Sequence, residues 1–150
     1  MGDANGWELR GERTWKMELT QGGMDWLEVR GFHAGAEVWH VDACLGGSHY
    51  KINDAFQTRE AAQGCALLLA MRQTPAHRDR ARAQLEALPG AWWWKITPRD
   101  DPSEDHRSIY SSRVWDSQES AERSGRAAGK GWCLFVYGPG SSHGIGQLPR

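Results

Sequence analysis

Apolar and polar positions alternate over several short stretches in the first third of the chain. Residues 14–20 (TWKMELT) follow this pattern, and residues 24–32, 36–45 and 49–53 are three further strand candidates. Glycine-containing turns separate them, and the turn at residues 31–35 has the length of a hairpin loop. Strands joined by short turns usually pair with one another, so the pattern predicts an antiparallel meander.

A strand-to-helix corner follows the meander and returns later in the chain. The first copy covers residues 49–72 and the second covers residues 108–130, with the shared skeletons Phe56-x-Thr58-x-Glu60-x-Ala62 and Trp115-x-Ser117-x-Glu119-x-Ala121. The hydroxyl of Thr58 or Ser117 is expected to accept a hydrogen bond from an amide of the first helical turn. In the first helix, helical spacing predicts a buried stripe that consists of Ala61, Cys65, Leu68 and Leu69 and is widened by Ala62 and Ala66. The repeat suggests two copies of a strand–strand–helix unit.

A second helix is predicted over residues 75–88, because Thr74 is a good N-cap and Pro75 is favoured in the first helical turn. We expect its arginines to point mostly outward. Three further strands are predicted at residues 92–97, 109–114 and 132–137. The last of these strands is apolar at every position, which is typical of a strand covered on both faces.

These elements predict an α+β protein whose mostly antiparallel sheet is covered by two or three helices. A length of 150 residues fits one domain. We expect this domain to cover residues 13–137, with halves at residues 13–73 and 91–137 joined by the second helix. Residues 1–12 and 138–150 are rich in glycine and polar side chains, so we expect both ends to be flexible.

Charge and cysteine content restrict the environment of the protein. A net charge of −1 gives no general attraction to nucleic acid or to an anionic membrane. Cys44, Cys65 and Cys133 are widely spaced and form no CxxC pair, which favours reduced thiols in the cytoplasm. The N-terminus lacks the plan of a secretory signal, and the longest apolar run, at residues 66–71, is too short to span a bilayer. We therefore expect a cytoplasmic protein with no membrane partner.

The sequence contains no recognised catalytic motif, since GxSxG and GxxxxGK[ST] are both absent. His40 and Asp42 share one face of a predicted strand with Cys44, but positions four apart on a strand lie roughly 13 Å apart, beyond hydrogen-bond reach. A polar outer face is the better interpretation, and an enzyme of unknown class is retained as an alternative. The histidines lack zinc-site spacing, although strand pairing would bring together His33, His40 and His49. We predict no catalytic residue, no cofactor and no metal site.

A second hypothesis is a nucleic-acid-binding module. Its basic helix face would consist of Arg72, Arg78, Arg80 and Arg82, which could contact phosphates while a neighbouring tryptophan ring stacks on a base. The strand–strand–strand–helix run over residues 26–72 contains the corner FQTREAA. This run resembles the arm-type DNA-binding domains of phage integrases and the hybrid-binding domain of some ribonucleases H, which implies nucleic-acid binding through the strands. The strands of this chain, however, also carry Glu28, Glu37 and Asp42.

Three consecutive tryptophans and an acidic loop carry the preferred hypothesis. On a strand, Trp93 points to the face opposite Trp92 and Trp94, so at least one ring is exposed if either face is wet. The loop that follows contains four acidic residues, Asp100, Asp101, Glu104 and Asp105. Exposed tryptophan beside charge is typical of a binding hot spot. We therefore expect a small non-enzymatic interaction protein, of the inhibitor or adaptor type that phages and mobile elements carry, which docks on a larger protein partner with a basic surface.

Overall fold

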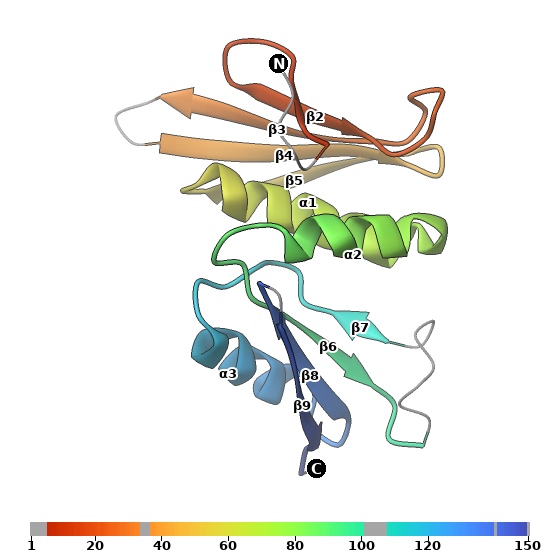
Figure 1. Ribbon diagram of the computed structural model, residues 1–150, viewed down its shortest axis with the longest axis vertical. Coiled ribbons are helices and arrows are strands. Elements are labelled where there is room, and N and C mark those ends of the chain that lie inside the picture. The colour runs from red at the N-terminus through yellow and green to blue at the C-terminus, as the bar shows by residue number, and fades with distance from the viewer. Residues whose placement is uncertain (1–5, 34–36, 101–107, 140, 150) are drawn as a thin grey trace.

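The predicted α+β fold is confirmed by the computed structural model in Figure 1, which describes residues 6–33, 37–100, 108–139 and 141–149. These residues form two antiparallel sheets and three α-helices. The five-stranded sheet contains, in spatial order, β1 (Glu8–Leu9), β2 (Thr14–Glu18), β3 (Trp26–His33), β4 (Glu37–Leu45) and β5 (Ser48–Phe56). The four-stranded sheet contains β7 (Ile109–Tyr110), β6 (Trp93–Thr97), β8 (Cys133–Gly138) and β9 (Ser141–Gln147). The helices are α1 (Arg59–Gln73), α2 (Arg78–Glu86), preceded by the 3-10 turn η1 (Pro75–His77), and α3 (Gln118–Ala128).

The five-stranded sheet is the predicted meander. Gly46 and Gly47 have φ values of 58° and 84°, so they form a two-residue turn that closes the hairpin between β4 and β5. Strand β5 continues to Phe56, beyond the predicted end at Asn53, because a bulge opposite His40 absorbs extra residues before pairing resumes. Alternate side chains of each long strand therefore face helix α1, and their neighbours face away from it.

Helix α1 is buried on every side over residues 62–71. The five-stranded sheet lies on one side of it, and α2 and the second sheet lie on the other side (Figure 1). Residues 62–71 (AQGCALLLAM) contain no charged side chain, so the helix can be covered all round. The buried surface is therefore wider than the predicted stripe, which did not include Gln63 or Leu67, and Ala61 is only half-buried. No helix among the described residues is long and apolar enough to cross a membrane.

The four-stranded sheet is covered on both faces, as predicted for its strand β8. Every residue of β6 is buried. Trp93 stacks on Tyr137 with ring centroids 4.3 Å apart, on the face toward α2. Trp94 points to the opposite face, where its indole nitrogen donates to Ser124 of α3 at 3.0 Å. The predicted alternation is confirmed, and each face has its own helical cover.

Both repeated corners cap their helices as predicted. The Thr58 hydroxyl accepts from the Ala61 amide at 3.1 Å, and the Ser117 hydroxyl accepts from the Ser120 amide at 3.1 Å. Helix α1 packs on the first sheet and α3 packs on the second, so each corner belongs to its own layer.

The structure differs from the predicted ends of the chain. Residues 141–147 belong to β9, which pairs with β8, instead of a flexible tail, because β8 presents a full backbone edge for pairing. Near the other end, Trp7 has 0% of its surface exposed and β1 pairs with β2. The strand predicted at residues 109–114 is shorter and ends at Tyr110. The Ser111 amide still donates to the Trp94 carbonyl at 2.9 Å, but the Trp94 amide donates to the Ser111 hydroxyl instead of to a backbone carbonyl.

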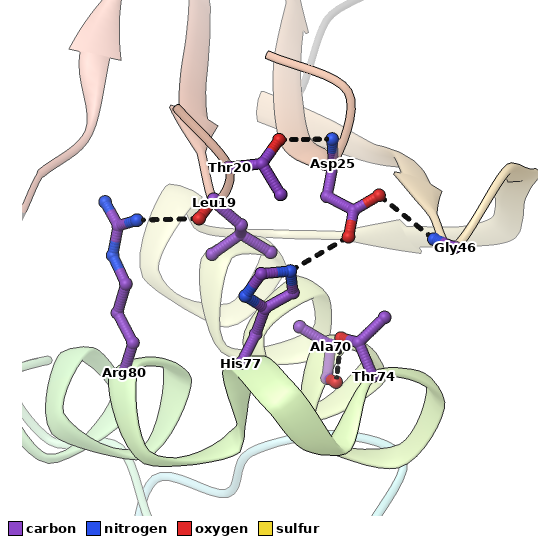
Figure 2. Close-up of polar contacts among 8 residues, drawn as sticks. All are labelled: Leu19, Thr20, Asp25, Gly46, Ala70, Thr74, His77 and Arg80. Atoms are coloured by element: carbon purple, nitrogen blue, oxygen red, sulfur yellow. Dashed lines mark hydrogen bonds and ion pairs between the residues drawn. The ribbon is translucent and has the colours of Figure 1, made fainter. Parts of the chain in front are cut away.

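The α1–α2 junction is fixed to the turns of the first sheet (Figure 2). One carboxylate oxygen of Asp25 accepts from the Gly46 amide at 3.0 Å, and the other lies 2.9 Å from Nε2 of His77. Arg80 donates to the Leu19 carbonyl at 3.0 Å. Thr74 does not cap η1 with its side chain as predicted, because its hydroxyl donates to the Ala70 carbonyl at 2.7 Å.

We predict that the Asp25–His77 pair is energetically coupled, because both side chains are mostly buried, with exposed fractions of 13% and 16%. A double-mutant cycle of Asp25→Ala and His77→Ala should give a coupling free energy of about 1–2 kcal/mol in urea unfolding. The matched control is the Arg82–Glu86 pair on α2, whose side chains are more exposed at 38% and 44%, and it should give roughly 0.5 kcal/mol or less. Equal coupling in the two cycles would contradict this prediction.

We also predict that Gly64 sets the distance between α1 and the second half. A Cβ atom at Gly64 would lie 2.5 Å from a methyl carbon of Val114, so the two segments would have to move apart. Gly64→Ala should lower the free energy of unfolding by about 1–3 kcal/mol, although alanine favours helix. The double variant Gly64→Ala with Val114→Ala should lose less stability than the sum of the two single variants, because the second change removes the clashing methyl groups. Additive losses would show that the contact is not limiting.

Candidate functional site

A cleft of about 950 Å³ separates the two halves of the molecule at the N-terminal end of α1. One wall consists of the last residues of β5 and the first turn of α1. The other wall consists of residues 112–116, which connect β7 to α3, and residues 89–91 close the end between α2 and β6. The two corners of the internal repeat therefore face each other across this cleft.

Both walls include backbone at the edge of a sheet. Strand β5 is the last strand of the first sheet, so its far edge has no neighbouring strand in the described structure. The segment leading to α3 lies at the β7 edge of the second sheet, where Trp92 and Trp115 exchange backbone hydrogen bonds of 2.9 and 2.6 Å. A segment in the cleft would therefore meet peptide backbone from both sheets.

The floor of the cleft is apolar and its rim is acidic. Phe56, Ala61, Ala91 and Val114 supply apolar surface. The rim carries three carboxylates, Asp54, Glu60 and Asp116, and one guanidinium, Arg113. The Arg113 guanidinium lies 4.6 Å from the centre of the Trp115 ring, which is a cation–π distance. Glu60 is 3.6 Å from Arg59, and the side chains of Asp54 and Asp116 are exposed at the rim.

Cys65 is a buried thiol of α1 close to this cleft. Burial raises the pKa of Cys65 to about 11, with a further rise from Asp54, while Arg72 and Arg113 act in the opposite direction. A thiol with this pKa is almost fully protonated at neutral pH and is a poor nucleophile. The described residues that line the cleft include no histidine that could act as its base.

The three tryptophans of the preferred docking hypothesis do not form an exposed group. Trp93 is fully buried and Trp94 is 7% exposed, so the wet face assumed from the sequence is covered by α2 and α3. Trp92 is half-buried and packs against the smaller core around α3. Asp100 is exposed, and Asp101, Glu104 and Asp105 lie outside the described residues. The proposed tryptophan surface is therefore incorrect for Trp93 and Trp94.

The four arginines of the nucleic-acid hypothesis contact other parts of the protein. Arg72 donates to the Ser111 carbonyl at 3.2 Å, and Arg80 binds the Leu19 carbonyl as described above. Arg78 lies 5.6 Å from the Tyr110 ring centre, and Arg82 lies 4.7 Å from that of Tyr137. Arg78 and Arg82 are half-buried against the second sheet, so the prediction that they point outward is wrong.

The residues of the enzyme alternative lie on the outer face of the first sheet, away from the cleft. Asp42 approaches His49 of the neighbouring strand at 3.4 Å, whereas His40 makes an edge-to-face contact with Phe32. Cys44 is a free, half-buried thiol on the same face. Among the residues that the structure describes, no group of three or more histidine, cysteine, aspartate or glutamate side chains is placed to hold a metal ion.

Sequence reasoning did not select Asp54, Arg113 and Asp116. The repeat marked both corners as architectural features, and these three residues lie next to them. The missing information was that the corners face each other, which depends on how α1 packs against the second half. Comparisons of the chain with models of known protein families, with curated proteins and with solved structures found no match.

The raised pKa of Cys65 predicts a specific loss of stability in alkali. Above the ordinary pKa of 9.0 the unfolded thiol ionises, while the folded thiol stays protonated until about pH 11. Ionisation of this thiol therefore stabilises the unfolded state as pH rises through this window. The free energy of unfolding should fall by on the order of 2 kcal/mol as a result.

Urea unfolding of the native protein and of Cys65→Ala at several pH values between about 8 and 11 measures this effect, because the titration of other groups cancels in the difference. The native protein should lose more stability than the variant. Parallel stability curves would show that Cys65 titrates normally.

Proposed function

We propose that the protein is a non-enzymatic interaction protein, of the inhibitor or adaptor type, which binds a basic segment of a larger protein partner in the cleft between its two halves. The observation that carries the proposal is the composition of this cleft. Exposed carboxylates of Asp54 and Asp116 stand on opposite walls above an apolar floor. This arrangement suits a lysine or arginine side chain followed by an apolar one, since the charged head meets the rim and the carbon stem covers the floor.

The chemistry of the cleft supports binding more than catalysis. The two rim aspartates are exposed, so their carboxylates keep most of their hydration and are not held in the desolvated setting that tunes a general acid or base. The nearby thiol of Cys65 is buried and protonated, as described above. All three cysteines are free, which supports our proposal of a reducing, cytoplasmic environment.

A protein partner is better supported than nucleic acid. Phosphate contacts require cations that can reach the ligand, and the guanidinium groups of Arg78 and Arg82 already lie over aromatic rings of the second sheet. The cleft rim itself has more carboxylates than cations. A basic peptide therefore has the charge complementarity that a phosphate backbone lacks.

We predict that a basic peptide binds and that its affinity depends on the rim carboxylates. The probe is the blocked, fluorescently labelled peptide Lys-Val-Lys-Val-Glu-Val, and fluorescence anisotropy measures its binding. Reversal of two charges by Asp54→Lys with Asp116→Lys should weaken binding about tenfold, which corresponds to roughly 1.4 kcal/mol from two exposed ion pairs. Binding should also weaken as salt is added.

The matched control reverses two exposed acidic residues outside the cleft, by Glu12→Lys with Asp79→Lys, and should leave the affinity within about twofold. The charge-swapped peptide Glu-Val-Glu-Val-Lys-Val and a short oligothymidylate complete the test. Equal loss in both variants would indicate a general charge effect and reject the cleft as the site. Tighter binding of the oligonucleotide than of the basic peptide would favour the nucleic-acid hypothesis instead.

A further inference from the structure

We infer that the bound partner segment is extended and pairs with β5 as a sixth strand of the first sheet, an inference that rests on the proposed function. Strand β5 leads directly into the cleft, because its last residues, Asp54, Ala55 and Phe56, line one wall. A chain that leaves the cleft on this side passes along the open edge of the strand. Addition of a strand to an exposed sheet edge is a recurrent mode of peptide recognition.

The hydrogen-bonding pattern of the β4–β5 hairpin shows which backbone groups of β5 are available. Leu45 and Ser48 flank the Gly46–Gly47 turn, so they form the closing hydrogen-bonded pair. Bonded and non-bonded pairs alternate in an antiparallel ladder. Tyr50 and Ile52 therefore direct their amide and carbonyl groups toward β4, whereas His49 and Lys51 direct theirs toward the open edge.

The surroundings of the edge leave room for another strand. Ser48, His49, Lys51, Asn53, Asp54 and Ala55 are all exposed. The unpaired backbone groups at the edge can be satisfied by water or by a partner strand. All pairs in this sheet are antiparallel, and an added antiparallel strand would place its N-terminal end in the cleft, next to the acidic rim.

A second copy of this chain is a poor occupant of the edge. Antiparallel pairing of two β5 edges centred on Lys51 would bring two lysines opposite each other, which is destabilising. A partner with an acidic or neutral residue near Lys51 and basic residues near the cleft avoids this repulsion. The edge and the cleft together therefore select a segment that is basic at its N-terminal end and neutral or acidic a few residues later.

The premise is tested in the free protein by amide hydrogen exchange. The amides of Tyr50 and Ile52 should exchange slowly because they are bonded to β4, and those of His49 and Lys51 should exchange at least about tenfold faster. Equal protection of all four amides would show that the edge is already covered and would overturn the inference.

Strand addition is tested with a peptide held at the cleft by a disulfide. The peptide Cys-Lys-Val-Lys-Val-Glu-Val, blocked at both ends, is coupled to Gln57→Cys, whose position lines the cleft. The variant also carries Cys44→Ser, which removes the half-buried competing thiol. The tether supplies a high effective concentration, so weak pairing becomes measurable. The matched control peptide, Cys-Lys-Pro-Lys-Pro-Glu-Pro, has the same charges but lacks the amides that its prolines replace.

The valine adduct should slow exchange of the His49 and Lys51 amides by about tenfold or more, with no change at Tyr50 and Ile52. The proline adduct should leave all four rates as in the uncoupled protein. Identical rates in the two adducts would overturn strand addition. This failure is distinct from that of the proposed function, because the tether does not depend on the rim charges and the free-peptide affinities are measured separately.

Discussion

The burial of α1 on all sides is the constraint on which the rest of the structure depends. Residues 62–71 of this helix are covered by the five-stranded sheet on one side and by α2 and the second half on the other. Burial of apolar surface is the main favourable term in folding, and neither layer alone could cover the helix. The close approach of Gly64 to Val114 shows that the second half packs directly on the helix backbone. The two halves therefore share the main core through one face of the second sheet, while a smaller core lies between its other face and α3.

The cleft is a consequence of the same packing. Each half ends a strand and begins a helix at its own corner, and α1 brings the two corners to opposite sides of one opening. The apolar floor comes from residues that also belong to the core, including Phe56 and Val114. The charged rim comes from exposed residues at the corners, where substitutions cost little stability. The core thus sets the shape of the cleft, while the charges at its rim can vary without disturbing the fold.

Local sequence patterns predicted the elements better than the contacts between them. Alternation gave the meander and placed Trp93 opposite its neighbours, and the hydroxyl residues Thr58 and Ser117 identified both helix starts. Alternation cannot say what covers a face, and here the stem and guanidinium group of Arg82 on α2 cover Trp93 and Tyr137. Strand β9 was missed because its sequence contains two glycines, and Ile145 is its one β-branched residue. Asp54 and Asp116 are distant in sequence, so only the tertiary packing reveals them as a pair.

The central position of α1 has a consequence for how the protein is made. During synthesis the first sheet and α1 leave the ribosome before the residues of α2 and the second sheet, and domains begin to fold as they emerge. Until the second half arrives, one side of α1, rich in leucine and alanine, faces water. A nascent chain stopped after residue 73 therefore exposes an aggregation-prone apolar surface. Chaperones that bind exposed hydrophobic segments are expected to bind this surface.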